Sequence, residues 1–566
     1  MTARMRQVCM ASAVVAASTA CTPPIEPADL VLRHGRIVTM DDVMPEAQAL
    51  AARGGRIVAV GRDAEMERYI SPSTTVIDLA GRLATPGFIE GHGHFLGVGD
   101  AKLQLDLTDA RTWAEVVAMV ADAAARARPG ELVRGRGWHQ DEWNPLPSPV
   151  VQGLPLHDDL SAVSPDNPVL LVHASGHATF ANRRAMELAG ISRQMRNPAG
   201  GVIVRDREGD PTGAFLETAA ALLDRVRESA APADPHRQAE LAQREALSKG
   251  ITTFQDAGSS FEAADLFKAM IDDGSLSLRL WVMLQEANER LASRMADYRL
   301  VGHGGDRLTV RAIKRSIDGA LGSRGAWLLE PYADLAATTG LNTTPVEQIE
   351  EAARLAIANG FQLCVHAIGD RANRETLDLY ERMFAAHPGD ADLRWRIEHA
   401  QHLHPDDIPR FAALGVIASM QGVHATSDGS WVPDRLGARR TEEGAYVWQK
   451  LLQSGAVVVN GTDAPVEDVN PIRSFYASVS RRLADGSVFY PDQRMSRLEA
   501  LRSYTLSAAY AGFEEHIKGS LTPGKLADVV VLSKDILTIL EEEIPTTQIV
   551  YTIIGGRVVY EADVAH

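Results

Sequence analysis

The stretch Pro86-Gly-Phe-Ile-Glu-Gly-His-Gly-His94 places two histidines, one residue apart, at the end of an apolar run. Side chains two positions apart on a β-strand point to the same face, so His92 and His94 would project into one space. This is a chelating geometry. In a chain with 17 histidines, a lone pair of this kind could also be a surface strand or a chance pairing, so its meaning depends on the rest of the sequence.

Three further apolar runs downstream end in a side chain that can bind a metal. They are Phe361-Gln-Leu-Cys-Val-His366, Arg394-Trp-Arg-Ile-Glu-His399 and Ala456-Val-Val-Val-Asn-Gly-Thr-Asp463. Each predicts a buried strand that ends in a chemically active residue. Together with the histidine pair, these strand ends favour a shared metal site over chance.

Strand-like runs followed by helical stretches, such as Val346–Ala358 and Asp406–Leu414, occur eight times along the chain. This alternation predicts an α/β fold of the (β/α)8 type (TIM barrel), whose active site lies at the carboxyl ends of the strands. The candidate ligands stand at such ends. The expected strands are Pro86–Phe95, Gly250–Ala257, Arg279–Leu284, Leu308–Asp318, Phe361–His366, Arg394–His399, Gly415–Gln421 and Ala456–Asp463.

The segments on either side of the barrel share a Gly-Arg-apolar-apolar unit that follows another apolar run, as in hairpins. The units are Gly35–Val38, Gly55–Val58 and Gly556–Val559. We therefore expect residues 28–85 and 511–566 to form one small β-sandwich beside a barrel that spans residues 86–510. Residues 96–249 form a long insertion after the first barrel strand, which we expect to be a lid or a pocket wall.

The composition is that of a globular protein, since 566 residues with 45% hydrophobic residues can bury a large core. The formal net charge of −17, without a long basic cluster, argues against nucleic acid and anionic membrane surfaces as partners. The cysteines are Cys9, Cys21 and Cys364, and they provide no disulfide framework because the first two lie in a targeting segment. We expect a small-molecule substrate and, by default, a homodimer.

Residues 1–21 combine a basic start, a short apolar core and small residues, which is typical of a bacterial export signal. Ser18-Thr-Ala-Cys21 resembles a lipoprotein processing site, which would make Cys21 the lipidated first residue of the mature chain. Ordinary signal cleavage and a misread start codon are the alternatives. The segment is too short to span a membrane as a permanent helix, so we expect an exported protein that is periplasmic or anchored by a lipid on Cys21.

The candidate ligands indicate a reaction. Imidazole nitrogens from His92, His94, His366 and His399, with a carboxylate from Asp463, suit zinc or a neighbouring divalent metal. Such a metal lowers the pKa of bound water towards ~7 and supplies hydroxide at neutral pH. Hydrolysis is the natural reaction of this set.

With these motifs, nearly the whole mature chain resembles the amidohydrolase superfamily, and more narrowly its YtcJ-like amidohydrolase family 3, which is similar to N-substituted formamide deformylases. The motifs are Pro86–His94, Gly135-Arg-Gly-Trp138, Ser175-Gly-His-Ala178, Asp318-Gly-Ala-Leu-Gly-Ser-Arg324 and Gly519-Ser-Leu-Thr-Pro-Gly-Lys-Leu-Ala-Asp-Val-Val-Val531. The resemblance implies two zinc ions per chain. One is held by His92, His94 and Asp463 and the other by His366 and His399, with Lys314 between them.

The resemblance also assigns roles to Lys314 and Asp463. In many superfamily members a lysine at this position carries a carboxylate from CO2 and bridges two metals, and burial favours the neutral amine that this reaction needs. The alternative is a salt bridge from Lys314 to a carboxylate such as Asp318. Asp463 would take a proton from the attacking water and deliver it to the leaving nitrogen. If the site holds one metal, Lys314 is idle and the mechanism resembles that of the deaminases.

Further residues carry weaker expectations. His177 would contact substrate or hydrogen-bond the oxyanion, and its alternative is a loop histidine. The candidate substrate-binding residues are Trp138, Asp318 and Arg324, where Trp138 could instead belong to the core and Arg324 could pair with an acid. Cys364 is expected to pack inside the barrel, and His402 and His404 are expected to face solvent. The sequence predicts no particular place for His424. Glu90, where relatives often have aspartate, is expected to affect substrate choice.

The sequence thus predicts a metal-dependent hydrolase of a non-peptide carbon–nitrogen bond in a small amide, N-formyl amine, lactam or cyclic imide. Three alternatives remain. The same site could act as an esterase or carbamate hydrolase, or as a mononuclear deaminase, or the chain could be an exported binding protein without turnover. The fold does not distinguish these functions, so the choice among them depends on the residues of the site.

Overall fold

The computed structural model describes residues 26–228, 234–389 and 392–563. The expected export segment, with Cys9 and Cys21, lies outside these residues and stays a prediction. Among the described residues, none of the helices has both the length and the apolarity needed to cross a membrane.

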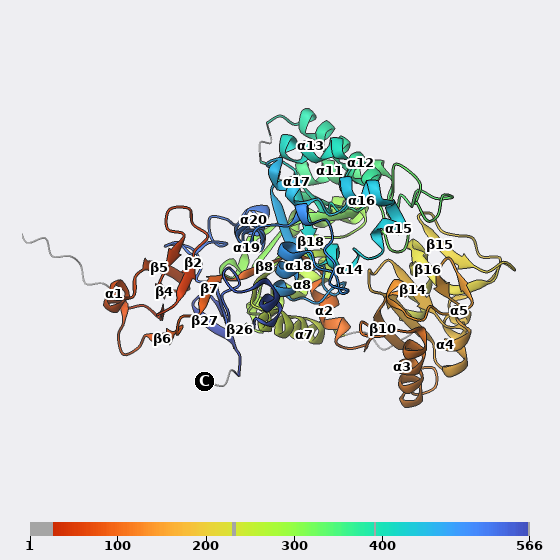
Figure 1. The fold of residues 1–566 in the computed structure, drawn as a ribbon, viewed down its shortest axis with the longest axis horizontal. Helices are drawn as coiled ribbons and strands as arrows, with labels where there is room; N and C mark the ends of the chain where they lie inside the picture. The colour runs from red at the N-terminus through yellow and green to blue at the C-terminus, as the bar shows by residue number, and fades with distance from the viewer. Residues whose placement is uncertain (1–25, 229–233, 390–391, 564–566) are drawn as a thin grey trace, which may run out of the picture.

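The centre of the molecule is a nearly closed barrel of eight parallel strands, as the sequence predicts (Figure 1). The sheet runs in chain order from the first strand to the last, and a backbone hydrogen bond from Asp463 N to His92 O (2.7 Å) links its two edges. The strands are β8 (Phe88–Gly93), β17 (Ile251–Ser259), β18 (Arg279–Leu284), β20 (Leu308–Ser316), β21 (Gln362–Ala367), β22 (Arg396–His399), β23 (Ile417–Gln421) and β24 (Val458–Gly461).

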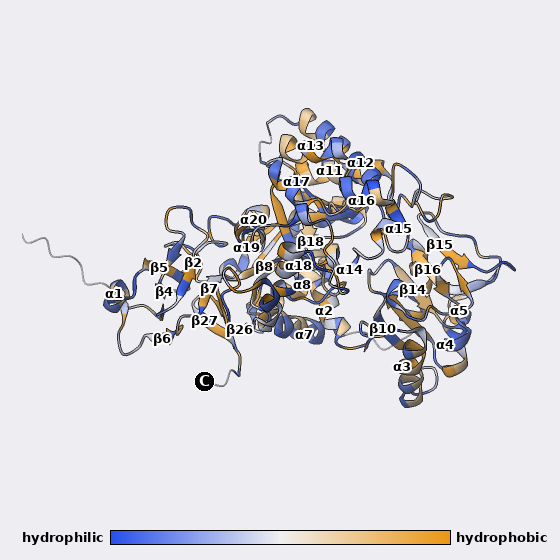
Figure 2. Ribbon diagram, viewed as in Figure 1, coloured by the Kyte–Doolittle hydropathy of each residue, from blue (hydrophilic) through white to orange (hydrophobic). Residues whose placement is uncertain are grey.

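Each barrel strand forms because an apolar run can be buried on both of its faces, which is the usual pattern of parallel sheets. All residues of β18 are buried. Inside the barrel, Trp281 packs with Met283 and Cys364, so the expected position of the cysteine is confirmed. Outside it, α11 (Val346–Asn359) buries a stripe that includes Ile349 and Ala356. Figure 2 shows apolar residues concentrated along the strands and hydrophilic ones on outer helices such as α7 (Pro235–Ser248).

The two ends of the chain meet in one sheet, as predicted. Its order is β27-β26-β25-β7-β2-β3, so it combines C-terminal and N-terminal strands. The strands are β2 (Arg36–Val38), β3 (Glu46–Ala47), β7 (Leu83–Pro86), β25 (Val529–Leu532), β26 (Ile549–Ile554) and β27 (Arg557–Glu561). A second sheet contains N-terminal strands alone: β1 (Leu30–Arg33), β4 (Ala49–Arg53), β5 (Arg56–Gly61) and β6 (Thr75–Asp78). Apolar residues from both sheets, such as Leu50 and Val529, share one core.

The insertion after β8 folds around a sheet of its own, with the order β15-β16-β14-β13-β10-β9. The strands are β9 (Leu105–Asp106), β10 (Val133–Trp138), β13 (Val169–His173), β14 (Ala178–Ala181), β15 (Gly201–Arg205) and β16 (Pro211–Glu217). In Figure 1 this part lies on the right, and the terminal strands lie on the left of the barrel. The carboxyl ends of the barrel strands, where a barrel enzyme carries its site, face the insertion, because residues at these ends line one cavity together with residues of the insertion.

Candidate metal centre

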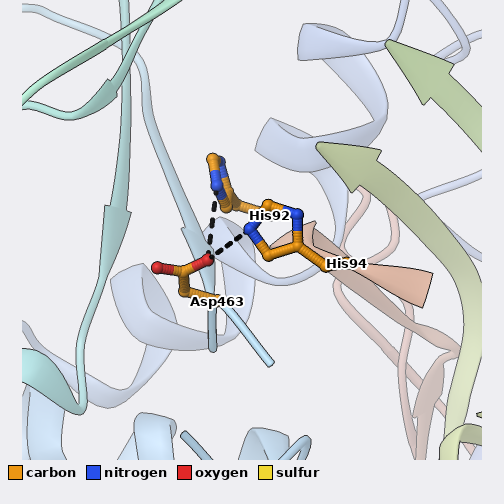
Figure 3. A group of neighbouring side chains, drawn as sticks. All are labelled: His92, His94 and Asp463. Atoms are coloured by element: carbon orange, nitrogen blue, oxygen red, sulfur yellow. Dashed lines mark ion pairs between the residues drawn. The ribbon is translucent and has the colours of Figure 1, made fainter. Parts of the chain in front are cut away.

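Three of the expected ligands converge at one point where the barrel closes (Figure 3). His92 belongs to β8, His94 caps the following helix α2 (Phe95–Ala101), and Asp463 follows β24. Asp463 Oδ1 lies 3.1 Å from His94 Nε2 and 3.5 Å from His92 Nε2. One ligand atom from each residue lies within 4.8 Å of the others, a group that could hold a metal ion.

The chemistry of this group fits a divalent cation. Within the described part of the chain, Asp463 Oδ1 and His366 Nε2 are buried without a hydrogen-bond partner, which is costly unless a ligand satisfies them. Burial lowers the pKa of His92 to about 4, so its imidazole is neutral and can ligate. Burial alone would raise the pKa of Asp463, but the neighbouring histidines, led by His94, hold it well below its usual value, so the carboxylate is ionised.

His92 is oriented by a buried acid that the sequence reasoning missed. Its Nδ1 is hydrogen-bonded to Glu398 Oε2, which leaves Nε2 for the centre. Glu398 is in turn held by Arg396, whose Nε lies 2.7 Å from Glu398 Oε1, and both side chains are fully buried. Burial alone would raise the pKa of Glu398, but Arg396 and His92 hold it well below the usual range. Such carboxylate partners fix the tautomer and orientation of metal-binding histidines.

His366 and His399 lie next to this group. The His399 ring centroid is 4.8 Å from that of His92 and 4.5 Å from that of His366. His399 Nδ1 is bonded to Gln421 Oε1 at 2.8 Å, which leaves its Nε2 free to ligate. Burial holds the pKa of both His366 and His399 well below the usual value, so both rings are neutral. The structure therefore brings these two residues to the place where the resemblance puts a second metal.

Lys314 stands among the same histidines. Its side chain, in β20, is buried, and Nζ lies 3.3 Å from His92 Nε2 and 3.4 Å from Ala257 O. No carboxylate of the described residues forms an ion pair with it, so the alternative of a salt bridge to Asp318 is wrong. Burial lowers the pKa of Lys314, which favours the neutral amine. Carboxylation of this amine stays a prediction.

Asp318 does not line the cavity, although its Oδ1 lies 3.5 Å from His366 Nε2, and its expected contact with substrate stays a prediction. Its carboxylate accepts backbone N–H groups of Ile368 (3.0 Å), Gly369 (2.8 Å) and Trp327 (2.8 Å). Burial raises the pKa of Asp318 to about 7. Because Ile368 and Gly369 directly follow β21, Asp318 fixes the loop that leads away from His366.

A cavity of about 540 Å³ opens at this end of the barrel. Asp463, His366 and His399 line it from the barrel, and Arg136 and His177 line it from the insertion. The insertion is therefore a pocket wall, one of the two roles expected for it.

His177 reaches the barrel mouth from the insertion, as expected. Its ring centroid lies 5.2 Å from that of His366, and its Nδ1 is 2.7 Å from Glu217 Oε2. Burial would lower the pKa of His177, but the Glu217 carboxylate outweighs burial and raises it. Its catalytic role stays a prediction, and the alternative of a capped loop histidine stays open, since His177 lies in the bend before β14 with its Nδ1 bonded to Glu217.

Trp138 and Arg324 do not line the cavity, so the structure gives neither the expected contact with substrate. Trp138 is fully buried in the core of the insertion, and its indole N–H donates to Leu171 O (3.0 Å). Arg324 Nη2 donates to Asp334 Oδ2 (2.8 Å). In both cases the alternative given by the sequence holds, because each polar group already has a partner inside the protein.

Four other residues test the remaining expectations. His402 is buried rather than in solvent, and burial lowers its pKa to about 3, whereas His404 is partly exposed. His424, for which the sequence predicts no particular place, lines the cavity. Glu90 is fully buried and accepts bonds from Thr462 N (2.7 Å) and His92 N (3.1 Å). It therefore ties the first strand to the last and does not touch the cavity.

The sequence reasoning also missed Arg136 and Glu217. Arg136 lines the cavity and donates to Pro465 O (3.1 Å) and Ala174 O (3.0 Å). Arg136 lies in the motif Gly135–Trp138 and Glu217 in none of the motifs, and nothing local indicates that either residue approaches the barrel mouth. Pairing between distant strands places them there.

Comparison with known proteins agrees with this geometry. The profile of the Amidohydrolase family matches residues 75–560. Protein LONG AFTER FAR-RED 3 of Arabidopsis thaliana is 34% identical, over 95% of this chain and 93% of its own length. The putative amidohydrolase YtcJ of Bacillus subtilis is 31% identical (93% and 98%), and the N-substituted formamide deformylase of Arthrobacter pascens is 28% identical (94% and 98%).

A solved structure is similar over nearly the same length. An uncharacterized metal-dependent hydrolase from Pyrococcus horikoshii matches with a TM-score of 0.72 at 25% identity, over 91% of this chain and 99% of that chain.

Proposed function

The chain belongs to the amidohydrolase family, in its YtcJ-like branch, and from this premise we propose that it hydrolyses a non-peptide carbon–nitrogen bond in a small molecule. The substrate would be an amide, an N-formyl amine, a lactam or a cyclic imide. One observation carries the proposal: His92, His94 and Asp463 point at one centre, where Asp463 Oδ1 is buried beside the two imidazoles and, among the described residues, accepts no hydrogen bond.

The proposal includes a divalent metal, with zinc as the first choice because the donor set consists of imidazoles and one carboxylate. His92, His94 and Asp463 would hold one ion, and His366 and His399 would hold a second. Lys314 would bridge the two as a carboxylate. A bound metal of this kind lowers the pKa of a water molecule and polarises a substrate carbonyl.

Three residues of the chain would then act beside the metal. Asp463, an ionised carboxylate at the cavity wall, accepts a proton from the attacking water and returns it to the leaving nitrogen. His177, which lines the cavity from the insertion, contacts the carbonyl oxygen, where negative charge develops. The buried pair Glu398–His92 keeps the first ligand in its orientation during both steps.

An N-formyl amine is the first substrate class to examine, because the Arthrobacter pascens relative is named an N-substituted formamide deformylase. The identity of 28% supports this class without fixing the side group of the amine. Esters and carbamates share the attack on a carbonyl, and a heterocyclic amine would lose ammonia in the same site. A binding protein without turnover gains little from a complete set of neutral histidines around an ionised Asp463.

The first experiment combines metal analysis with assays on the protein purified without chelator and in the presence of bicarbonate. We expect about two metal equivalents per chain, falling to one or none in Lys314→Ala, and formate release from N-substituted formamides. We expect Asp463→Asn to lower kcat by about 10²–10⁴-fold, the usual contribution of general acid–base catalysis.

Other outcomes select the alternatives. One equivalent that Lys314→Ala does not change, together with ammonia release, would indicate a mononuclear deaminase. Hydrolysis of esters or carbamates alone would select that class. If the purified protein holds no metal and turns over none of these substrates, the catalytic proposal is wrong and the binding protein is favoured.

A further inference from the structure

We propose that Glu217 is a positioning residue that holds His177 against the candidate metal centre and fixes which of its ring nitrogens faces the cavity. The inference rests on the proposed function, because His177 needs a fixed orientation only if it contacts the reacting carbonyl. It adds a carboxylate that neither the motifs nor the expected ligand set contains.

Strand pairing brings the two residues together. In the sheet of the insertion, β14 and β16 are antiparallel, with Ala178 opposite Leu216. His177 and Glu217 are the next residues on either side, and Glu217 N donates to His177 O at 2.8 Å. Their side chains meet as well, with His177 Nδ1 2.7 Å from Glu217 Oε2. The Glu217 side chain is only 3% exposed.

The barrel receives the Glu217 carboxylate between two glycines of the segment Asp318–Gly325. A Cβ atom added to Gly319 would lie 2.2 Å from Glu217 Oε1, and one added to Gly325 would lie 2.1 Å from the same oxygen. Any larger residue at either position would collide with the carboxylate. Ser323 Oγ donates to this oxygen at 3.2 Å. The motif after β20 is thus shaped around a side chain that comes from the insertion.

Glu217 also has a strained backbone, with φ of 52°. A non-glycine residue in this region costs about 1–3 kcal/mol and persists only where the surroundings enforce it. Here the strain turns the chain at the end of β16 and directs the carboxylate towards the barrel. Observed strain of this kind is a reason to look for a functional constraint.

The consequence for His177 follows from the acceptor character of a carboxylate. Because Glu217 Oε2 accepts, Nδ1 carries a proton and Nε2 faces the cavity that His177 lines. A carboxylate on Nδ1 also stabilises the imidazolium form, in which Nε2–H can donate to a substrate oxygen. The ring is fixed beside His366 at 5.2 Å. A substrate oxygen would meet a histidine whose orientation is already set, so less ordering is needed on binding.

The test is a double-mutant cycle in the full chain. We expect Glu217→Gln to lower kcat/KM on the accepted substrate by about 10- to 100-fold, the usual effect of losing such an orienting partner. We expect the loss mainly in kcat, with metal content unchanged. In a His177→Ala background, the same substitution should cause little further loss, because the residue that Glu217 orients is gone. Glu131→Gln, at an exposed position of the insertion, is the matched control.

A second measurement tests the inference independently of the proposed hydrolase activity. In ¹H–¹⁵N spectra of the histidine rings, the signal that disappears in His177→Ala should show the proton on Nδ1, and Glu217→Gln should shift it. This measurement needs no substrate, so it can be made even if every hydrolase assay fails.

Two results would overturn the inference. One is an equal loss from Glu217→Gln with and without His177, which would make Glu217 a packing residue. The other is a His177 ring signal that does not change when the carboxylate is removed.

Discussion

His399 and Asp463 have left-handed backbones, with φ of 74° and 57°, although neither is a glycine. Each such residue costs about 1–3 kcal/mol, and strained residues cluster at active sites where the surrounding structure holds them. His399 is the last residue of β22 and Asp463 lies two residues beyond β24, so both stand where the chain turns at the end of a barrel strand. The positions of these side chains are therefore imposed by the fold and are not local preferences.

The carboxylate that orients the candidate ligand His92 can be tested by a single substitution. Glu398→Gln removes the charge that orients His92 and leaves Arg396 buried without its counter-ion. We expect metal affinity to fall by about 10- to 100-fold, as is usual when such a partner of a ligand is lost. A competition titration with a chromophoric chelator measures the change.

Glu208→Gln, in an exposed turn of the insertion, is the control for this substitution and should leave affinity unchanged. Equal affinity in Glu398→Gln and the native chain would mean that packing alone orients His92.

At the scale of elements, a buried ion pair joins the barrel to the terminal sandwich. Arg279 begins β18, and its guanidinium makes two bonds to Asp528, which precedes β25 (2.7 and 3.0 Å). Both side chains are almost fully buried. Gly555 N also donates to Asp528 Oδ1 at 2.8 Å. One carboxylate thus connects a barrel strand with two strands near the C-terminus.

This pair predicts a pH-dependent stability. Burial alone would raise the pKa of Asp528, but Arg279 outweighs burial and the pKa is lowered. A carboxyl group whose pKa is lower in the folded than in the unfolded protein contributes stability at pH values above its unfolded pKa of about 3.9. This contribution is lost as the pH falls through the folded-state pKa. We expect Asp528→Asn to cost about 3–5 kcal/mol at neutral pH, since Arg279 loses its partner.

Unfolding midpoints of the two proteins, measured from neutral pH down to below about pH 4, test this expectation. The difference between the native chain and Asp528→Asn should shrink at the acid end. Asp122→Asn, on the exposed surface of the insertion, should behave like the native chain throughout. A difference that stays constant over the whole range would show that the charge of Asp528 is not what stabilises the junction.

At the scale of the whole molecule, an ion-pair network ties the insertion to the barrel. Arg435 lies in α15 (Val432–Leu436), and its guanidinium donates to Asp141 of the insertion and to Asp334 of the loop after β20, each at 2.7 Å. Arg324 donates to the same Asp334. The wall of the cavity is therefore fastened to the barrel by charged contacts around one arginine.

We expect Arg435→Ala to loosen this wall while leaving the metal content unchanged. A hydrogen bond between charged groups contributes about 1.5–3 kcal/mol, so opening of the insertion should become about tenfold or more frequent. Limited proteolysis followed by mass spectrometry should show faster cleavage within residues 96–249, and KM should rise.

Arg439→Ala removes an arginine whose ion pairs are exposed and serves as the matched control. Unchanged proteolysis in Arg435→Ala would mean that apolar packing, and not this network, holds the insertion in place.

The sequence alone determined the barrel, its eight strands, the sheet shared by both ends and the ligand candidates. The reason is that buried strands have a local signature, an apolar run, and that a barrel brings all strand ends to one face. For this reason the sequence pattern is enough to place His92, His94 and Asp463 together.

Only the tertiary structure decided which partner each side chain has. Glu398 meets His92 across 306 residues, and Glu217 meets His177 across 40. Trp138 and Arg324 satisfy their polar groups inside the protein, so neither reaches the cavity. Strand pairing and register between distant segments fix these contacts, and no local pattern encodes them.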